Sequence, residues 1–268
     1  ISNPVTSQLG ASDEHNKNLI KQHQVKQIPI VDDQNHIHAL YIWDEDDQVE
    51  VRDNPILIMA GGFGKRMMPL TRDIPKAMLR VGNVTLIEDK IIKLTEAGIK
   101  KIVINTGYLG DYIQEHVGDG SKYGINIVIS DEGSMPIGTA NGIRKIIKEF
   151  NGKPFLVVNA DIWTNYLFID LINMSLMKEA LAHIVLAKKP EYLKGDFNIN
   201  NNKISEGNDF IYTGIGIYKP ELFLNYTDIE LGSILHKENN IGAELYKGLW
   251  DDVGTPDRLN MIRERIAL

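Results

Sequence analysis

The chain has 268 residues, of which 43% are hydrophobic, enough to bury the core of one large domain or of one domain and a smaller unit. Acidic residues outnumber basic ones by 36 to 29, so the net charge of −7 excludes a general affinity for nucleic acid or anionic membranes. Cysteine is absent, which excludes disulfides, thiolate metal sites and a cysteine nucleophile. No apolar run approaches the roughly 18 residues that span a membrane, and no signal-peptide pattern opens the chain. We therefore expect a cytoplasmic protein.

The first fifty residues predict a small unit of their own. A polar segment at Asp13–His23 predicts a helix, and IPIV and HALYIW predict two strands joined by the turn DDQN. The acidic segment DEDDQVEVRDN, residues 44–54, marks a change of composition after this unit. Fifty residues are few for an independent domain. Because the chain also starts with Ile1 rather than Met, we expect this unit to need upstream residues or a second subunit.

From residue 55 onward, strand and helix patterns alternate. Strands are predicted over residues 56–59, 102–105, 125–130, 155–161, 182–189 and 210–218. Helices are predicted over residues 84–98, 111–117, 137–150 and 255–266, the first with a Thr85/Glu88 capping box and the last with Thr255 as its N-cap. This alternation is typical of an α/β domain in which helices flank a mostly parallel sheet.

The segment AGGFGKRMMPLTRDIPKAML, residues 60–79, directly follows the strand predicted at 56–59. A glycine-rich turn after a strand predicts a phosphate-binding loop, because glycine lets backbone N–H groups approach an anion closely. A Walker A loop would need glycine at Met59 and Ser or Thr at Arg66, and the dinucleotide fingerprint would need glycine at Met67. Neither a P-loop nucleoside triphosphatase nor a Rossmann dehydrogenase is therefore predicted.

This segment resembles the signature of the sugar-1-phosphate nucleotidylyltransferases, G-G-x-G-[TK]-R-[LM]-x-P-L-T followed by P-K. The resemblance covers nearly all of residues 55–268. It implies the nucleotide-diphospho-sugar transferase fold, a Rossmann-like, mostly parallel mixed sheet flanked by helices. It also implies the reaction: a nucleoside monophosphate passes from a nucleoside triphosphate to a sugar 1-phosphate, and pyrophosphate is released.

The resemblance further implies which residues bind the nucleotide. Arg66 would follow the β- and γ-phosphates and Lys76 would lie near the α-phosphate, because two anionic reactants meet only when cations neutralise them. Arg72, in the same segment, is expected to be a solvated surface charge. The remaining nucleotide-binding residues would be Ala60, Gly61, Gly62, Gly64, Lys65, Asn105, Gly138 and Thr139.

Two aspartates far apart in the sequence predict a metal site. Asp161 ends the segment LVVNAD and Asp252 lies in WDDVGTP, and both segments resemble metal-binding motifs of the family. Two carboxylates, together with phosphate oxygens and water, suit Mg²⁺. Location supports this prediction, since the glycine loop follows the strand residues 56–59, Asn105 follows 102–104 and Asp161 follows 155–158, and open α/β sheets bind ligands at the carboxyl ends of their strands.

The second half of the chain predicts the substrate. LVVNADIWTNY, KGDFNI, YTGIGIYKPELF and GLWDDVGTPDRL resemble the N-acetylmuramate-1-phosphate uridylyltransferase branch, which favours UTP. By this resemblance Asn159, Gly195, Asp196 and Thr213 would line the sugar pocket. A plain turn at Gly195 and a plain strand position at Thr213 stay open as alternatives.

Residues 1–48 favour a different nucleotide substrate, one with another base than uracil. The segment QIPIVDDQNHIHALYIWDE resembles half of a CBS-domain pair, a regulatory module that commonly binds adenine nucleotides when complete. Such pairs occur fused to guanylyltransferases, so GTP with an amino-sugar or mannose 1-phosphate is the alternative to UTP. An unpaired half-module implies a homodimer. Two further alternatives stay open, a non-catalytic nucleotide sensor and a GT-A glycosyltransferase.

Overall fold

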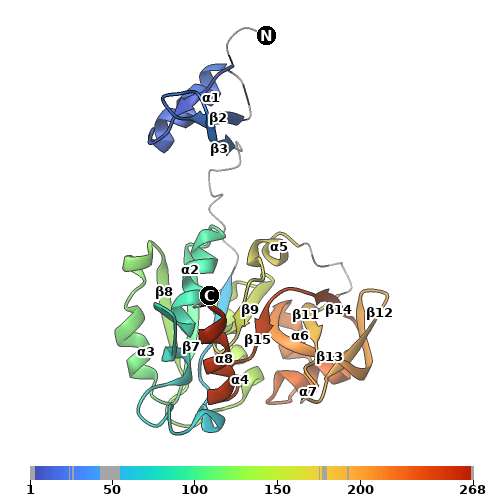
Figure 1. Cartoon of the computed structure of the whole chain (residues 1–268). Helices are drawn as coiled ribbons and strands as arrows, with labels where there is room; N and C mark the ends of the chain where they lie inside the picture. The colour runs from blue at the N-terminus through green and yellow to red at the C-terminus, as the bar shows by residue number, and fades with distance from the viewer. Residues whose placement is uncertain are drawn as a thin grey trace. The chain divides into compact units, whose positions relative to one another are not determined.

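The computed structural model describes residues 4–23, 25, 27–42, 55–174, 176, 180–191 and 193–266. It divides the chain into two compact units, residues 1–50 and 51–268 (Figure 1). The predicted acidic segment 44–54 lies outside the described residues. Among the helices in the described ranges, none is long and apolar enough to cross a membrane.

The first unit is a three-stranded sheet with one helix. Helix α1 spans Asp13–His23, and the strands are β1 (Ser7–Gln8), β2 (Gln27–Val31) and β3 (Ile37–Ile42). Strand β2 lies between β1, which is parallel to it, and β3, which is antiparallel. In the turn between β2 and β3, the Asp32 carboxylate accepts backbone N–H groups of residues 34 and 36, both at 2.9 Å. The predicted helix, the two strands and their turn are therefore confirmed.

The second unit is built on a mixed eight-stranded sheet. Its strands are β4 (Ile56–Met59), β7 (Lys101–Thr106), β8 (Asn126–Asp131), β9 (Phe155–Asn159), β11 (Ala182–Lys188), β12 (Phe197–Asn200), β13 (Lys203–Tyr218) and β14 (Ile241–Tyr246). Strands β9, β4, β7 and β8 lie side by side in this order and are parallel. Strand β13 runs antiparallel to both β9 and β11, and β11 pairs with β14 in parallel. The predicted α/β class is confirmed, with antiparallel pairing concentrated around β13.

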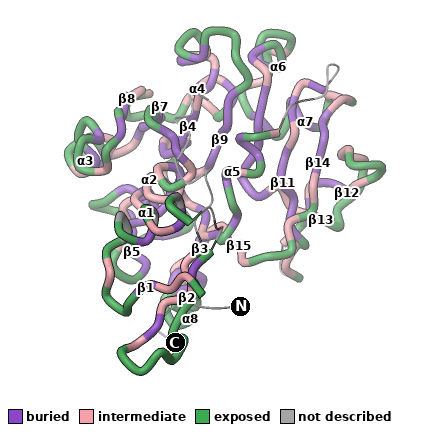
Figure 2. The backbone as a smooth tube through the Cα atoms, turned by 90° about the horizontal axis from the view of Figure 1, so that it is seen from above, coloured by how far each residue is buried: buried purple, intermediate pink, exposed green. Residues whose placement is uncertain are grey.

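Helices cover both faces of this sheet. They are α2 (Leu86–Glu96), α3 (Gly110–Val117), α4 (Thr139–Ile146), α5 (Phe168–Ile172), α6 (Pro220–Leu224) and α7 (Leu231–Lys237). Along β4, Ile56 and Ile58 pack with α2, α3 and α5, whereas Leu57 packs on the opposite face with α4, α6 and α7. Figure 2 shows the central strands β4 and β9 buried. The uninterrupted apolar run ILIM follows from this burial on both faces.

A third, smaller core lies beside the glycine loop. Met67 of the loop packs with Val253 and with Leu259 of helix α8 (Pro256–Ile266). Two short antiparallel ribbons complete this region, β5 (Arg80–Val81) with β6 (Val84–Thr85) and β10 (Trp163–Thr164) with β15 (Trp250–Asp251). The last helix is thus fixed against the segment that follows β4.

The predicted N-caps of α2 and α8 agree with the structure, whereas the helices predicted over 84–98 and 137–150 are shorter, at Leu86–Glu96 and Thr139–Ile146. The Thr85 hydroxyl accepts the Glu88 backbone N–H at 3.2 Å, and the Glu88 carboxylate accepts the Thr85 N–H at 2.9 Å, so the capping box is confirmed. Helix α8 begins at Pro256, and the preceding Thr255 hydroxyl accepts the N–H of residue 258 at 3.4 Å.

The predicted strand ends agree less well. Strand β9 stops at Asn159 rather than at 161, because the chain leaves the sheet there and enters the β10–β15 ribbon. Strand β13 starts at Lys203 rather than at 210, because its first part forms a hairpin with β12. That first part carries polar, mostly exposed residues, which give no apolar alternation from which a strand is predicted.

Candidate active site

A cleft of about 360 Å³ lies at the carboxyl ends of β4, β7, β8 and β9. Sequence reasoning predicted such a location from the strand–helix order. The cleft gathers segments that lie between residues 59 and 254 of the sequence. Twelve of the predicted site residues line it: Ala60, Gly61, Gly62, Gly64, Lys65, Arg66, Lys76, Asn105, Gly138, Thr139, Asn159 and Asp161.

One side of the glycine loop is anchored in the protein interior, and its two basic side chains are exposed. Gly64 has φ +62°, a left-handed conformation that favours glycine, and its carbonyl accepts the hydroxyl of the buried Thr71 at 2.8 Å. Met67 is fully buried in the third core, whereas Lys65 and Arg66 are exposed and line the cleft. Anchoring on one side thus presents two cations to any anion that enters the cleft.

The β10–β15 ribbon brings the segments of two distant aspartates together, although Asp252, unlike Asp161, is not among the residues that line the cleft. Asp161 comes two residues before Trp163 in β10, Asp252 comes one residue after Asp251 in β15, and Trp163 pairs with Asp251 across the ribbon. Antiparallel pairing therefore brings the two segments together. The Lys76 ammonium links them, because it donates to the Asp161 carboxylate at 2.6 Å and to the backbone carbonyl of Asp252 at 3.3 Å.

The donors present fit a hard divalent cation. Asp161 and Asp252 offer only carboxylate oxygens, the ligand type that Mg²⁺ prefers. In this structure each carboxylate is paired with a cation, Asp161 with Lys76 and Asp252 with Arg258 of α8. Among the described residues no three His, Cys, Asp or Glu side chains form a group that could hold a metal ion. An ion bound by these two aspartates would therefore take further ligands from substrate phosphates and water.

Glu132, which was not predicted, also lines the cleft. Its carboxylate accepts the side-chain N–H of the buried Asn105 at 2.8 Å. Gly142 of α4 makes room for it, since a Cβ there would lie 2.2 Å from Glu132 Oε1. A sequence signal was available, because Glu132 stands just after the strand predicted at 125–130, at the carboxyl edge where Asn105 and Asp161 end the strands predicted at 102–105 and 155–161.

Glu230 is a second unpredicted cleft residue. Its carboxylate accepts the Thr139 hydroxyl at 3.0 Å, and that hydroxyl accepts the backbone N–H of Leu231 at 2.7 Å. The first turns of α4 and α7 are thereby joined. Gly138 has φ +90° and lies so close to α7 that a Cβ would be 2.5 Å from the carbonyl oxygen of Ile229. No local pattern predicts this contact, because the partners are 91 residues apart.

Three of the predicted sugar-pocket residues are not among those that line the cleft, and each has a partner within the sheet region. Gly195 lies against β13, where a Cβ would be 2.0 Å from the carbonyl oxygen of residue 208. The Asp196 carboxylate accepts the N–H of Tyr212 at 2.9 Å. The Thr213 hydroxyl is buried and donates to the Val185 carbonyl at 2.7 Å. These contacts support the turn and strand alternatives for Gly195 and Thr213.

Comparison with known proteins identifies the family. Residues 56–197 match the family described as nucleotidyl transferase. The chain belongs to this family. It is 37% identical over 220 residues to the N-acetylmuramate alpha-1-phosphate uridylyltransferase of Neisseria meningitidis serogroup B, covering 76% of this chain and 94% of the relative. It is 30% identical over 222 residues to a probable mannose-1-phosphate guanylyltransferase 1 of Oryza sativa, covering 75% of this chain and 61% of the relative.

Solved structures share the fold. The structure of HddC from Yersinia pseudotuberculosis complexed with GMP-PN superimposes with a TM-score of 0.68 at 21% identity, covering 80% of this chain and 99% of that one. A UDP-glucose pyrophosphorylase complexed with UDP-glucose gives a TM-score of 0.66 at 16% identity, covering 80% of this chain and 98% of that one. These likenesses confirm the predicted nucleotide-diphospho-sugar transferase fold.

The protein is a sugar-1-phosphate nucleotidyltransferase, as the sequence predicted. Nucleotidyltransferases of this family generally use a divalent metal. The family match disfavours the two alternatives of a nucleotide sensor and a GT-A glycosyltransferase. It begins at residue 56, so the CBS-like nature of residues 1–48 stays a prediction.

Gly142→Ala should weaken nucleotide binding, because its new Cβ would displace Glu132 and break the bond from Asn105. We expect KM for the nucleoside triphosphate to rise about tenfold, the loss of about 1.4 kcal/mol of binding free energy, with kcat changed less. Steady-state kinetics would measure this. Gly232→Ala in α7 is the matched control, since no atom lies within 4 Å of its Cβ position. An unchanged KM in Gly142→Ala would show that Glu132 does not contact the nucleotide.

Proposed function

We propose that the protein transfers UMP from UTP to N-acetylmuramate 1-phosphate, giving the UDP-sugar and pyrophosphate. The observation that carries this choice is the extent of the match. At 37% identity the chain spans 94% of the length of the Neisseria uridylyltransferase, whereas it spans 61% of the rice guanylyltransferase.

The chemistry requires charge neutralisation more than proton transfer. An oxygen of the sugar phosphate attacks the α-phosphorus, the bond to the α,β-bridging oxygen breaks, and pyrophosphate leaves with the electron pair. In this proposal Arg66 follows the leaving pyrophosphate and Lys76 stabilises the α-phosphate, because preorganised cations stabilise charge that develops in the transition state. The loop residues Gly61, Gly62 and Gly64 hold the triphosphate with their backbone N–H groups.

Asp161 and Asp252 would hold the divalent ion, for which we propose Mg²⁺. Carboxylate oxygens fit this ion, and it supplies positive charge that offsets the phosphates of both reactants when it is bound. Asn159, at the carboxyl end of β9 and in the cleft, would contact the sugar. We further propose that the reaction takes place in the cytoplasm.

A specific observation favours a second candidate, guanylyl transfer from GTP to an amino-sugar or mannose 1-phosphate. The Glu132 carboxylate lines the cleft and would repel phosphates, so it suits the base. Guanine offers two adjacent N–H donors, on N1 and N2, to a carboxylate, whereas uracil offers one donor between two carbonyl acceptors. Asn105 holds the carboxylate in place for such a contact.

Pyrophosphate release tests the proposal. UTP, GTP, CTP and ATP would be crossed, with Mg²⁺, against the 1-phosphates of N-acetylmuramate, glucosamine, N-acetylglucosamine, glucose and mannose. We expect the fastest release with UTP and N-acetylmuramate 1-phosphate, and none after EDTA. Preference for GTP would replace this choice by the second candidate. No release from any pair would contradict the proposed substrates altogether.

Arg66→Ala should lower kcat by about 10²–10³, as for other single electrostatic stabilisers, because the leaving pyrophosphate loses its cation. Stopped or continuous pyrophosphate assays at saturating substrate would measure the change. Arg72→Ala is the control, since Arg72 is exposed and is not among the residues that line the cleft. Near-normal turnover of Arg66→Ala would remove this arginine from the proposed mechanism.

For the first unit we propose a CBS-like half-module that pairs with a second copy and then binds an adenine nucleotide. Its strand β3 supports this, because Ile37, Leu40 and Ile42 are 70%, 49% and 62% exposed. So much apolar surface on so small a unit is typical of an interface.

The mass in solution tests this pairing. We expect light scattering to give a dimer for the whole chain and a monomer for Leu40→Asp, because a buried, unpaired carboxylate would oppose the interface. Leu224→Asp, at an exposed leucine of the second unit, is the control. A dimer that persists in Leu40→Asp, or a wild-type monomer with and without ATP, would contradict the proposal.

A further inference from the structure

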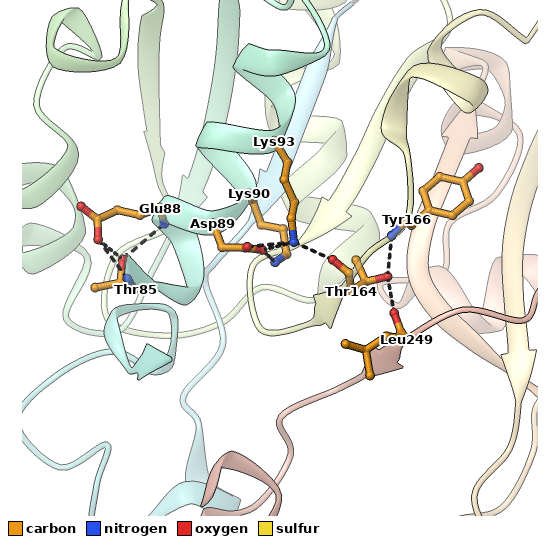
Figure 3. Close-up of polar contacts among 8 residues, drawn as sticks. All are labelled: Thr85, Glu88, Asp89, Lys90, Lys93, Thr164, Tyr166 and Leu249. Atoms are coloured by element: carbon orange, nitrogen blue, oxygen red, sulfur yellow. Dashed lines mark hydrogen bonds and ion pairs between the residues drawn. The ribbon is translucent and has the colours of Figure 1, made fainter. Parts of the chain in front are cut away.

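Three charged side chains of α2 pack inward, and the mechanism above uses none of them. The Lys90 side chain is fully buried, Asp89 is 7% exposed and the side chain of Lys93 is 26% exposed. Figure 3 shows these three side chains and their polar contacts. Asp89 pairs with both ammonium groups, with Lys93 at 2.8 Å. Burial lowers the pKa of Lys90 to about 8, which reflects the unfavourable desolvation of its charge. Such burial is rarely favourable for stability alone, so a function explains it better.

Lys93 reaches from α2 to the β10–β15 ribbon. Its ammonium donates to the backbone carbonyl of Thr164 at 2.6 Å (Figure 3). The Thr164 hydroxyl in turn donates to the Leu249 carbonyl at 2.9 Å and accepts the N–H of Tyr166 at 3.1 Å. The ammonium groups of Lys90 and Lys93 also lie 5.6 Å and 5.1 Å from the centre of the Trp163 ring. Of these two lysines, Lys93 donates a hydrogen bond to the backbone of the ribbon.

This ribbon carries both carboxylates assigned to the metal. Asp161 lies three residues before Thr164, and Asp252 follows β15 directly. With two residues in each strand, the ribbon has little stability of its own, because isolated short hairpins are marginal in water. Other contacts also hold this region: the Trp250 indole N–H donates to the Thr213 carbonyl at 2.9 Å, and the Lys76 ammonium donates to the Asp161 carboxylate and to the Asp252 carbonyl. The contacts of β10 are thus among several that place the carboxylates.

We propose that Lys93, oriented by Asp89, is a positioning residue that fixes the β10–β15 ribbon and thereby the placement of Asp161 and Asp252 for a divalent cation. The proposal rests on the assignment of these two aspartates to the metal. The positive charge of Lys93 does not explain its position, because a cationic side chain near Asp161 and Asp252 opposes the binding of a metal ion there. The bond to the Thr164 backbone gives that reason.

Metal binding without turnover tests the proposal. We would titrate the whole protein with Mn²⁺ alone and measure the free ion by electron paramagnetic resonance. Lys93→Met should weaken the Mn²⁺ complex about tenfold, as the loss of a residue that orients metal ligands does. Lys93→Arg keeps a donor and the charge, so it should bind within about twofold of wild type.

Lys90→Met is the matched control. It removes a buried cation from the same helix and leaves the bond from Lys93 to Thr164 in place. Mn²⁺ affinity should be unchanged or slightly tighter in this variant, although calorimetry should find it less stable than wild type, because the buried Asp89 loses one of its two ammonium partners. A loss of Mn²⁺ affinity that occurs in Lys93→Met and not in Lys90→Met would therefore reflect the position of the carboxylates rather than a change of charge or a failure to fold.

Two results would overturn the proposal. One is wild-type Mn²⁺ affinity in Lys93→Met, and the other is tighter binding, which would show that the lysine acts only as an opposing charge. If Lys93→Met fails to fold, weak binding by a folded Lys93→Arg variant would contradict the proposal in the same way. Failure of the sugar phosphates to react would bear on the proposed substrates alone, since the Mn²⁺ measurement involves no reaction.

Discussion

The register of four parallel strands is the constraint on which the active site depends. Met59 at the end of β4 pairs with Asn159 of β9 on one side and with Asn105 of β7 on the other, and β8 continues the row. Because the strands are parallel, their carboxyl ends meet at one edge, and the chain leaves each strand toward the same cleft. The glycine loop, the Asp161 segment and Glu132 are all positioned by this single row of pairs. A shift of one residue in any strand would turn its last side chain to the other face of the sheet.

Charged groups of both signs line the cleft. Lys65, Arg66 and Lys76 stand there beside Asp161, Glu132 and Glu230, in a protein whose net charge is −7. In our proposal the three cations face the two anionic reactants. The carboxylates of Glu132 and Glu230 line the same cleft but are held by neutral donors from β7 and α4. In our proposal, phosphates and the uncharged parts of the substrates thereby have different surroundings within one site.

Stability and function make different demands on the region around Asp161 and Asp252, the two carboxylates that we propose as metal ligands. The core there contains Asp89 and Lys90 next to apolar side chains, although apolar residues of similar size would be at least as stable. The bond from Lys93 to Thr164 shows what such a network does that apolar packing does not: it fixes a backbone carbonyl in direction as well as in distance. In our proposal the short β10–β15 ribbon, beside Asp161 and Asp252, depends on that direction.

The sequence by itself determined the features that depend on neighbouring residues. The apolar run at 56–59, the capping box of Thr85 and Glu88, and the gapped loop signature are local patterns, and each predicted its element and the family correctly. The tertiary structure alone decided the contacts between distant segments. The bond from Thr139 to Glu230, the partner of Lys93 and the burial of the Thr213 hydroxyl all depend on strand register and on how the layers pack. Periodicity carries no information about which distant backbone group a side chain will meet, because that choice is made only when the sheet and its helices assemble.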